Sequence, residues 1–369
     1  MQSYNQTRPR NSNPRAVAIV CWLVCNFSGL ILFLPDNLAA QAPVKTAEFL
    51  ATDSAAEGYE ARFPALGTLV EIKVFSANEQ LVSQIVRAAE LRTKAIEATL
   101  TDYDPDSETS TLTERATKGG FVTVSADLWN MLAESERWFK ISAGTFDASL
   151  GSLTRQWRAS RRTQHPLSED QRQRALQQSG WQNVQLNLDS KSVRFKRDGI
   201  RLDFGAIGKG YVVDEVFNLF YEAGLKQCLV NISGNMRLGD APPDRQGWRI
   251  EISPLEKGQP TLRRLLLKNT SIATSGDLWQ FTLIDGQRHS HIFDPRNGRS
   301  VRGPIAATVI APLASDADAC ATAVCVLGPA AGAQLVQSLP NMQALILEHS
   351  DSSLPVRYIA TEGFGLQQK

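Results

Sequence analysis

The alternation of short strand-like segments with helix-like segments most limits how this 369-residue chain can fold. Thr68–Phe75 places Val70, Ile72 and Val74 on one side, the period of two that is typical of a strand with one buried face. Residues 79–99 follow with apolar residues at helical spacing. Further strands are expected at 200–204, 228–232, 248–252 and 344–347 (the last one), and helices at 125–142, 212–223 and 315–327. Because antiparallel-looking strands are mixed with helices, the sequence predicts an α+β fold, a mixed sheet with packed helices.

The composition excludes two broad classes of protein. Apolar residues make up 43% of the chain, enough for a large core, so a mostly disordered chain is excluded. Lys and Arg number 39 against 38 Asp and Glu, and this net charge of +1 argues against bulk electrostatic binding of nucleic acid. Downstream of residue 40 only Cys228, Cys320 and Cys325 remain, in apolar segments, which indicates core packing rather than disulfides or zinc.

The N-terminal 40 residues have the pattern of a targeting segment. Arginines up to Arg15 precede an apolar stretch over 16–34, and small residues follow around Ala40 and Ala42. This order is typical of a secretory signal peptide cleaved after Ala40 or Ala42, and the length of the apolar stretch also fits an uncleaved membrane anchor. Either outcome predicts an exported protein, periplasmic or tethered to the outer face of the inner membrane.

The rest of the chain divides into a linker and one large domain. Residues 41–60 lack apolar periodicity and are interpreted as the linker, which leaves 61–369 for the domain. Within the domain, 155–174 is the one locally basic segment. It also holds acidic residues, so we interpret it as a solvated helical face rather than a binding patch.

The first segment with candidate chemistry runs from Leu202 to Asp214. An expected strand ends near Asp203, three glycines follow, and Lys209 stands where a helix begins. Glycines let the backbone approach a ligand, and the free N–H groups of a helix N-terminus favour an anion such as a phosphate. By itself the pattern is more commonly explained by a tight strand-to-helix turn without a ligand.

The second segment is the start of the helix expected at 315–327. Ser315 is a candidate N-cap, and Asp318 and Thr322 are four residues apart, so they share one helix face. A carboxylate and a hydroxyl together suit Mg²⁺, which prefers oxygen ligands. Alone, an acidic first turn is also explained by the helix dipole.

Two loops complete the set of candidate segments. His289 and His291 flank Ser290 in an expected strand and would share a face, where they could serve acid–base chemistry or orient a phosphate. A hydrogen-bonded histidine beside the turn at 294–298 is the structural alternative. The loop 144–151 follows a helix and indicates nothing by itself.

Together and in this order, the segments resemble the ApbE family, the FAD:protein FMN transferases, from Gly67 to Gly328. The resemblance rests on LGTLVEIKV, DYDPDSETSTL, GTFDASLGSL, LDFGAIGKGYVVD, LVNISGNMRLG, IATSGD, HSHIFDPRNG and DADACATAV. Three positions depart from the usual family pattern: Leu66 stands where Met is usual, Ser233 begins a Ser-Gly-Asn in place of Gly-Gly-Asp or Gly-Gly-Asn, and Cys320 stands where a larger apolar residue is common. None of these departures removes a metal ligand that the resemblance implies.

The resemblance implies a reaction and a set of site residues. The family cleaves the pyrophosphate of FAD, transfers FMN to a threonine hydroxyl of an acceptor protein, here an exported or membrane redox protein, and releases AMP. It implies Mg²⁺ held by the side chains of Asp318 and Thr322 and by the Ala206 carbonyl, with His291 orienting the phosphates or deprotonating the incoming threonine. The implied FAD contacts are Leu66, Tyr103, Thr145, Phe146, Asp147, Asp203, Lys209 and Ile292.

Two other functions remain open at this stage. If water replaced the threonine hydroxyl, the same site would be an FAD pyrophosphatase that releases AMP without an acceptor. A binding protein would hold FAD without turnover.

Overall fold

The computed structural model describes residues 50–51, 58–117, 120–253, 261–277, 281–301, 303–349 and 356–364. The predicted signal peptide or anchor over 1–40 lies outside these residues, as does most of the predicted linker. Within the described ranges, none of the helices combines the length and the apolar character that a membrane span requires.

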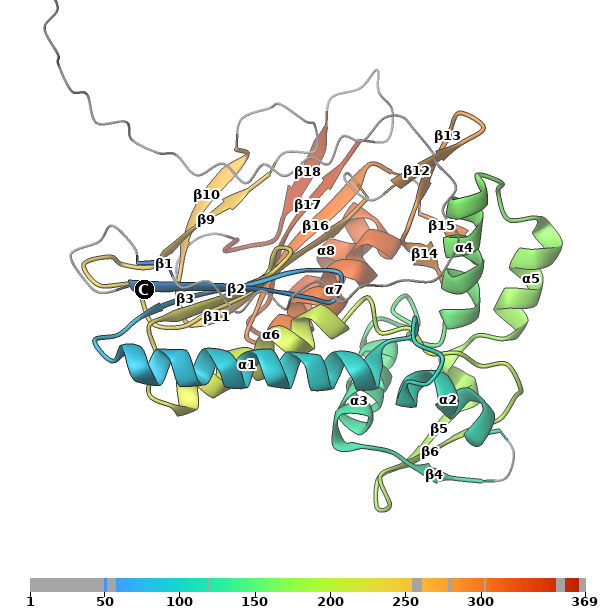
Figure 1. Ribbon diagram of the computed structural model, residues 1–369. Helices are drawn as coiled ribbons and strands as arrows, with labels where there is room; N and C mark the ends of the chain where they lie inside the picture. The colour runs from blue at the N-terminus through green and yellow to red at the C-terminus, as the bar shows by residue number, and fades with distance from the viewer. Residues whose placement is uncertain are drawn as a thin grey trace, which may run out of the picture. The chain divides into compact units, whose positions relative to one another are not determined.

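A nine-stranded antiparallel sheet forms the centre of the fold (Figure 1). Its strand order is β1, β2, β3, β7, β8, β11, β16, β17, β18. The bounds are β1 Leu50–Ala51, β2 Gly58–Ala65, β3 Thr68–Phe75, β7 Cys228–Ile232, β8 Asn235–Leu238, β11 Thr270–Gly276, β16 Ile305–Ala311, β17 Gln343–Glu348 and β18 Arg357–Ala360. β1 and the first three residues of β2 fall in the range 41–60, so the sheet includes five residues of the range interpreted as a linker.

Apolar layers cover both faces of this sheet. Four helices pack on one face: α1 (Glu79–Leu100), α6 (Gly208–Glu222), α7 (Ala314–Leu327) and α8 (Pro329–Gln337). The hairpin of β9 (Trp248–Ile252) and β10 (Arg263–Leu267) contributes to a second core on the other face. Consecutive residues of β16 therefore alternate between the two cores and all are buried, with Val309 on the helix side and Ile310 on the hairpin side.

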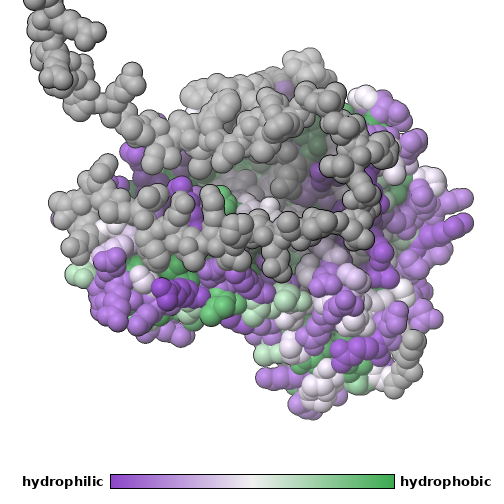
Figure 2. Space-filling model, viewed as in Figure 1, coloured by the Kyte–Doolittle hydropathy of each residue, from purple (hydrophilic) through white to green (hydrophobic). Residues whose placement is uncertain are grey.

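Smaller elements gather at one end of the sheet (Figure 1). They are the helices α2 (Glu108–Arg115), α3 (Ala126–Ile141), α4 (Gly151–Thr163) and α5 (Glu169–Gln177), the 3₁₀ turn Trp181–Asn183, the three-stranded sheet of β4 (Val122–Thr123), β6 (Ser192–Phe195) and β5 (Val184–Asn187), and the hairpins β12 (Phe281–Ile284) with β13 (Gln287–Ser290) and β14 (Phe293–Asp294) with β15 (Arg299–Ser300). Figure 2 shows a mainly hydrophilic surface on the described part of the face it draws, with small hydrophobic areas.

The α+β prediction is confirmed, and so are most of its elements. The strands at 68–75, 228–232 and 248–252 have the predicted bounds, and the helix that Ser125 caps runs to Ile141. The Ser125 hydroxyl accepts the Leu128 N–H at 3.4 Å. Cys228, Cys320 and Cys325 are free and buried, as core packing requires.

Three predicted elements are wrong or incomplete. Residues 200–204 make no sheet strand, because the segment pairs with the 144–151 loop through a single bridge between Leu150 and Arg201. Ser315 does not cap α7, which has Leu313 at its N-cap. β17 is not the last strand, because β18 follows at the sheet edge, with its mostly exposed residues giving no apolar pattern to detect.

Candidate active site

The site is built where the N-terminal turns of α6 and α7 approach each other. Gly210 makes this approach possible, because a Cβ there would lie 2.3 Å from the Ala314 carbonyl oxygen. Asp214, one turn further along α6, accepts the N–H groups of Ala314 and Ser315, each at 2.9 Å, and the Ser315 hydroxyl at 2.8 Å. A carboxylate from the neighbouring helix thus does the capping that the sequence assigned to Ser315.

Asp318 faces the first turn of α6. Its Oδ2 accepts the Gly210 N–H at 3.1 Å and lies 3.7 Å from the Lys209 Nζ. Only 3% of the residue is exposed. Burial raises the pKa of the Asp318 carboxyl, and the charge of Lys209 and the Gly210 N–H oppose that rise without cancelling it. Lys209 and the Gly210 N–H therefore compensate the negative charge of this buried carboxylate only in part.

The turn before α6 brings further polar groups to Lys209. The Asp203 carboxylate accepts the Gly205 N–H at 2.8 Å, and the Gly205 carbonyl accepts from Lys209 Nζ at 3.2 Å. Gly210, four residues after Ala206, sends its N–H to Asp318 rather than back along the chain. In the described part of the chain, no hydrogen bond ends on the Ala206 carbonyl.

Thr322 follows Asp318 by one helical turn and is half-buried. Its Oγ1 lies 3.0 Å from Ser275 Oγ on β11. Through this contact the sheet fixes the position of the Thr322 hydroxyl.

These groups fit a hard cation. Both contacts of the Asp318 carboxylate are made by Oδ2, and among the described residues Oδ1 has no hydrogen-bond partner. The described residues contain no group of three or more His, Cys, Asp or Glu side chains that could hold a metal ion, so a cation here would need other oxygen donors as well. The candidate donors are one carboxylate, one hydroxyl and one backbone carbonyl, all of them oxygen. A site with so few protein ligands leaves coordination positions for water or substrate phosphates, which is how Mg²⁺ is usually bound.

An arginine connects this centre to Tyr103. Arg158 of α4 lies between two carboxylates: its Nη1 is 3.3 Å from Asp102 Oδ1 and 3.6 Å from Asp203 Oδ2. Its guanidinium carbon is 4.4 Å from the centroid of the Tyr103 ring, and Tyr103 is 76% exposed. The pKa of Asp102 is raised, because burial and the charge of Asp203 together outweigh the opposing effect of Arg158. Interpreting the 155–174 segment as a solvated face is therefore wrong for Arg158.

The residues predicted in the 144–151 loop have structural contacts. Phe146 is buried, and so is Thr145, whose hydroxyl donates to the Ser142 carbonyl at 2.9 Å. Asp147 accepts the Ser149 N–H at 2.8 Å and the Trp181 N–H at 3.1 Å. The Asp203 N–H donates to the Ala148 carbonyl at 2.8 Å, so the loop lies beside the Asp203 turn. Contact with a ligand would fall mainly to the loop's backbone.

The other predicted positions lie in two further segments. Leu66 is in the two-residue turn between β2 and β3, with a φ of 54°, and its N–H donates to Glu97 Oε1 at 3.0 Å. Ile292 is buried in the main core. β13 ends at Ser290, so the prediction that His289 and His291 share a strand face is wrong. The His289 ring lies against Trp157 of α4, with ring centroids 5.8 Å apart and the ring planes tilted by 45°.

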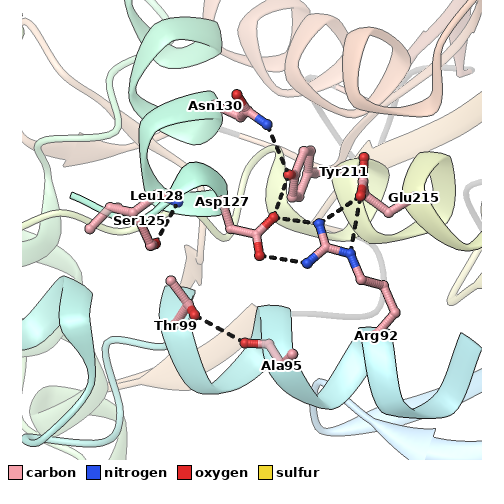
Figure 3. Close-up of polar contacts among 9 residues, drawn as sticks. All are labelled: Arg92, Ala95, Thr99, Ser125, Asp127, Leu128, Asn130, Tyr211 and Glu215. Atoms are coloured by element: carbon pink, nitrogen blue, oxygen red, sulfur yellow. Dashed lines mark hydrogen bonds and ion pairs between the residues drawn. The ribbon is translucent and has the colours of Figure 1, made fainter. Parts of the chain in front are cut away.

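A charged network anchors α6 to α1 and α3 (Figure 3). The Tyr211 hydroxyl donates to Asp127 at 2.7 Å, and Arg92 donates to Asp127 at 2.6 Å and to Glu215 at 2.6 Å. Burial alone raises the pKa of Asp127, but its hydrogen bonds from Arg92 and Tyr211 outweigh that effect and lower it. Because Tyr211 adjoins Gly210, the network fixes the turn that faces Asp318.

Sequence reasoning missed Arg158, Asp214 and Gly210 as residues that shape the site. Asp214 ends the LDFGAIGKGYVVD segment, but nothing in its spacing shows that it reaches a helix 100 residues away. The position of Arg158 in a basic run concealed its two carboxylate partners. The glycine between Lys209 and Tyr211 was the available signal for a close helix contact.

The sheet, its helical layer and this buried oxygen-rich centre define an α+β enzyme. A family model described as the ApbE family matches residues 66–346, and the chain belongs to that family. Proteins named FAD:protein FMN transferase from Treponema pallidum and Klebsiella pneumoniae are each 27% identical to it; the alignments cover 76% of this chain and 82% and 86% of theirs.

Solved structures agree with the fold. The flavin transferase ApbE from Vibrio cholerae has a TM-score of 0.74 at 23% identity, covering 84% of this chain and 98% of its own. The ApbE protein from Thermotoga maritima has a TM-score of 0.74 at 25% identity, covering 85% and 99%.

Proposed function

We propose that this protein is an FAD:protein FMN transferase that moves FMN from FAD to a threonine hydroxyl of an acceptor protein and releases AMP. The observation that carries the proposal is the buried Asp318 carboxylate held against Lys209 and Gly210, with the Thr322 hydroxyl one turn away. Phosphoryl transfer requires this combination of oxygen ligands and positive charge. Family membership and the names of the curated relatives support the same activity.

The chemistry of each residue suggests its role in this reaction. Asp318, Thr322 and the Ala206 carbonyl would hold Mg²⁺, which when bound neutralises charge on a pyrophosphate. Lys209 would place its ammonium group on the phosphates, and the exposed Tyr103 ring would contact the flavin. His291 adjoins the β13 end and would orient the phosphates or accept the threonine proton.

The direct test mixes the purified protein with FAD, Mg²⁺ and an acceptor domain that presents a threonine. Covalent flavin fluorescence on the acceptor, the FMN mass increment on its threonine and stoichiometric AMP are the expected results. The matched control is the same acceptor with that threonine changed to valine. AMP release without acceptor modification would instead establish an FAD pyrophosphatase, and tight FAD binding without AMP would establish a binding protein.

The role of His291 has its own test. If His291 accepts the threonine proton, His291→Gln lowers the rate of transfer by about 10²–10⁴-fold without changing the Mg²⁺ concentration required. His289→Gln is the matched control, two residues away. Equal rates for the wild type and His291→Gln would remove this residue from the mechanism.

We propose that the protein acts outside the cytoplasm, on an exported or membrane redox protein. The support is the arginine, apolar and small-residue order of residues 1–42. Cell fractionation followed by mass spectrometry of the mature N-terminus tests both the location and cleavage after Ala40 or Ala42. An intact N-terminus in the membrane fraction would indicate the anchor, and recovery in the cytoplasm would contradict the proposal.

A further inference from the structure

Tyr103 presents one ring face to solvent and has a cation behind the other. The residue is 76% exposed and follows the last residue of α1, the buried Leu100, by three positions. The guanidinium carbon of Arg158 lies 4.4 Å from the ring centroid. An exposed aromatic side chain usually samples several rotamers, and stacking on a fixed guanidinium restricts that freedom.

Arg158 is itself fixed by two acidic side chains. Asp102, the neighbour of Tyr103 in the chain, accepts from both terminal nitrogens of the guanidinium. Asp203, in the turn before α6, lies 3.6 Å from Nη1. The arginine side chain is 26% exposed and its two partners 16% and 18%, so solvent screens these ion pairs less than surface pairs.

From this geometry we infer that Arg158 is a positioning residue for the flavin ring: it stacks behind Tyr103 and holds that ring flat as a platform for the isoalloxazine. The inference rests on the proposed function, because that function supplies the flavin. A planar guanidinium can both pair with carboxylates and stack on a ring, which a lysine ammonium cannot do equally well. Through Asp203, the same arginine also links the platform to the turn that carries Lys209.

Binding of the two halves of FAD, measured separately, tests this inference. FMN is titrated with its own fluorescence as the probe and AMP is titrated by calorimetry, both without a divalent cation. We expect Arg158→Gln to weaken FMN binding at least tenfold and to reduce the quenching of bound FMN, with AMP affinity unchanged. Arg158→Lys retains the charge without the planar group and should recover little of the loss.

The matched control is Arg155→Gln, an exposed arginine on the same helix for which the described residues provide no ion-pair partner. It should bind FMN as the wild type does. Tyr103→Ala should lose FMN binding to a similar extent, and adding Arg158→Gln to it should cost little more, because both changes remove one platform. Thermal unfolding of each variant identifies any general loss of structure.

Several results would overturn the inference. These are wild-type FMN affinity in Arg158→Gln, an equal loss in Arg155→Gln, or fully additive losses in the double variant. Arg158-dependent FMN binding without transfer to any acceptor would contradict the proposed function and leave this inference standing. A wild-type protein that binds no flavin would overturn both.

Discussion

The Gly210 N–H donates to Asp318 Oδ2 across the contact between α6 and α7. This bond exists because the two helices meet without a side chain between them. In Gly210→Ala the new Cβ would lie 2.3 Å from the Ala314 carbonyl oxygen and 2.6 Å from the Ser315 Cα, both backbone atoms. We expect the helices to separate, with a loss of about 1–3 kcal/mol in the free energy of unfolding and of most transfer activity.

Gly208→Ala is the control for that change. Its nearest neighbour would be the Phe204 Cβ at 3.7 Å, which is ordinary contact, and it lies in the same turn. Denaturant unfolding and transfer assays should find this variant close to the wild type. Equal effects of the two substitutions would contradict a specific role for Gly210.

The Asp318 carboxyl gives a pH dependence with a definite sign. Burial raises its pKa, so the folded protein keeps the proton at pH values where the unfolded chain has released it. The free energy of unfolding therefore falls as the pH rises from about 4, the ordinary value for aspartate, through the raised folded-state value. An asparagine cannot ionise, so Asp318→Asn does not lose this stability as the pH rises. Above that pH range we expect Asp318→Asn to be more stable than the wild type in the absence of divalent cations.

Thermal unfolding over a pH series, with and without Mg²⁺, measures this effect. The stability difference should shrink as the pH falls through the raised pKa of Asp318 towards about 4, and vanish below that value, where the wild-type carboxyl is protonated in both states. Mg²⁺ should raise the Tm of the wild type and leave that of Asp318→Asn unchanged, because only the wild type offers the carboxylate. An equal Mg²⁺ shift in both proteins would show that the ion binds elsewhere.

The Thr322 hydroxyl is a candidate Mg²⁺ ligand and also contacts Ser275, and two variants separate these roles. Thr322→Val keeps the shape and removes the oxygen, and we expect the Mg²⁺ concentration for half-maximal transfer to rise by at least the ~10–100-fold that loss of a ligand's hydrogen-bond partner typically costs. Ser275→Ala removes the hydroxyl that lies 3.0 Å from Thr322 Oγ1 and keeps the candidate ligand, so its effect should be smaller. Direct Mn²⁺ titration by electron paramagnetic resonance gives the same comparison without turnover. Equal affinities for Thr322→Val and the wild type would exclude Thr322 as a ligand.

Local patterns predicted the elements well, because each depends on residues close in sequence. The period of two in β3 and the Ser125 cap of α3 are examples. The prediction of a strand at 200–204 was wrong for a physical reason. Ile200, Leu202 and Phe204 are buried as the alternation indicates, but among the described residues the segment pairs only through the single bridge between Leu150 and Arg201. Alternation predicts which side chains are buried, whereas pairing depends on distant parts of the chain.

The candidate site was predictable to the extent that its residues share a local segment. Helical spacing placed Asp318 and Thr322 on one helix face, and the glycine-rich turn singled out Lys209, but their candidate roles came only with the family resemblance. Arg158 and Asp214 could not be found this way, because the carboxylates that pair with Arg158 lie at least 45 residues away and the helix start that Asp214 caps lies 100 residues away. A charged side chain has no periodicity that identifies its partner, so the fold is needed to pair it.

Asp214 provides the last prediction, because one carboxylate serves two helices and one arginine. It accepts the Ala314 and Ser315 N–H groups of α7 and lies 3.0 Å from Arg237 Nη1 on β8. In Asp214→Asn the amide group would face donors on every side, and Arg237 would lose its charged partner. We expect a loss of about 3–5 kcal/mol in the free energy of unfolding, measured by urea denaturation. Ser315→Ala, which removes only the hydroxyl bond to Asp214, should cost about 1 kcal/mol, and a similar loss in both variants would refute the shared anchor.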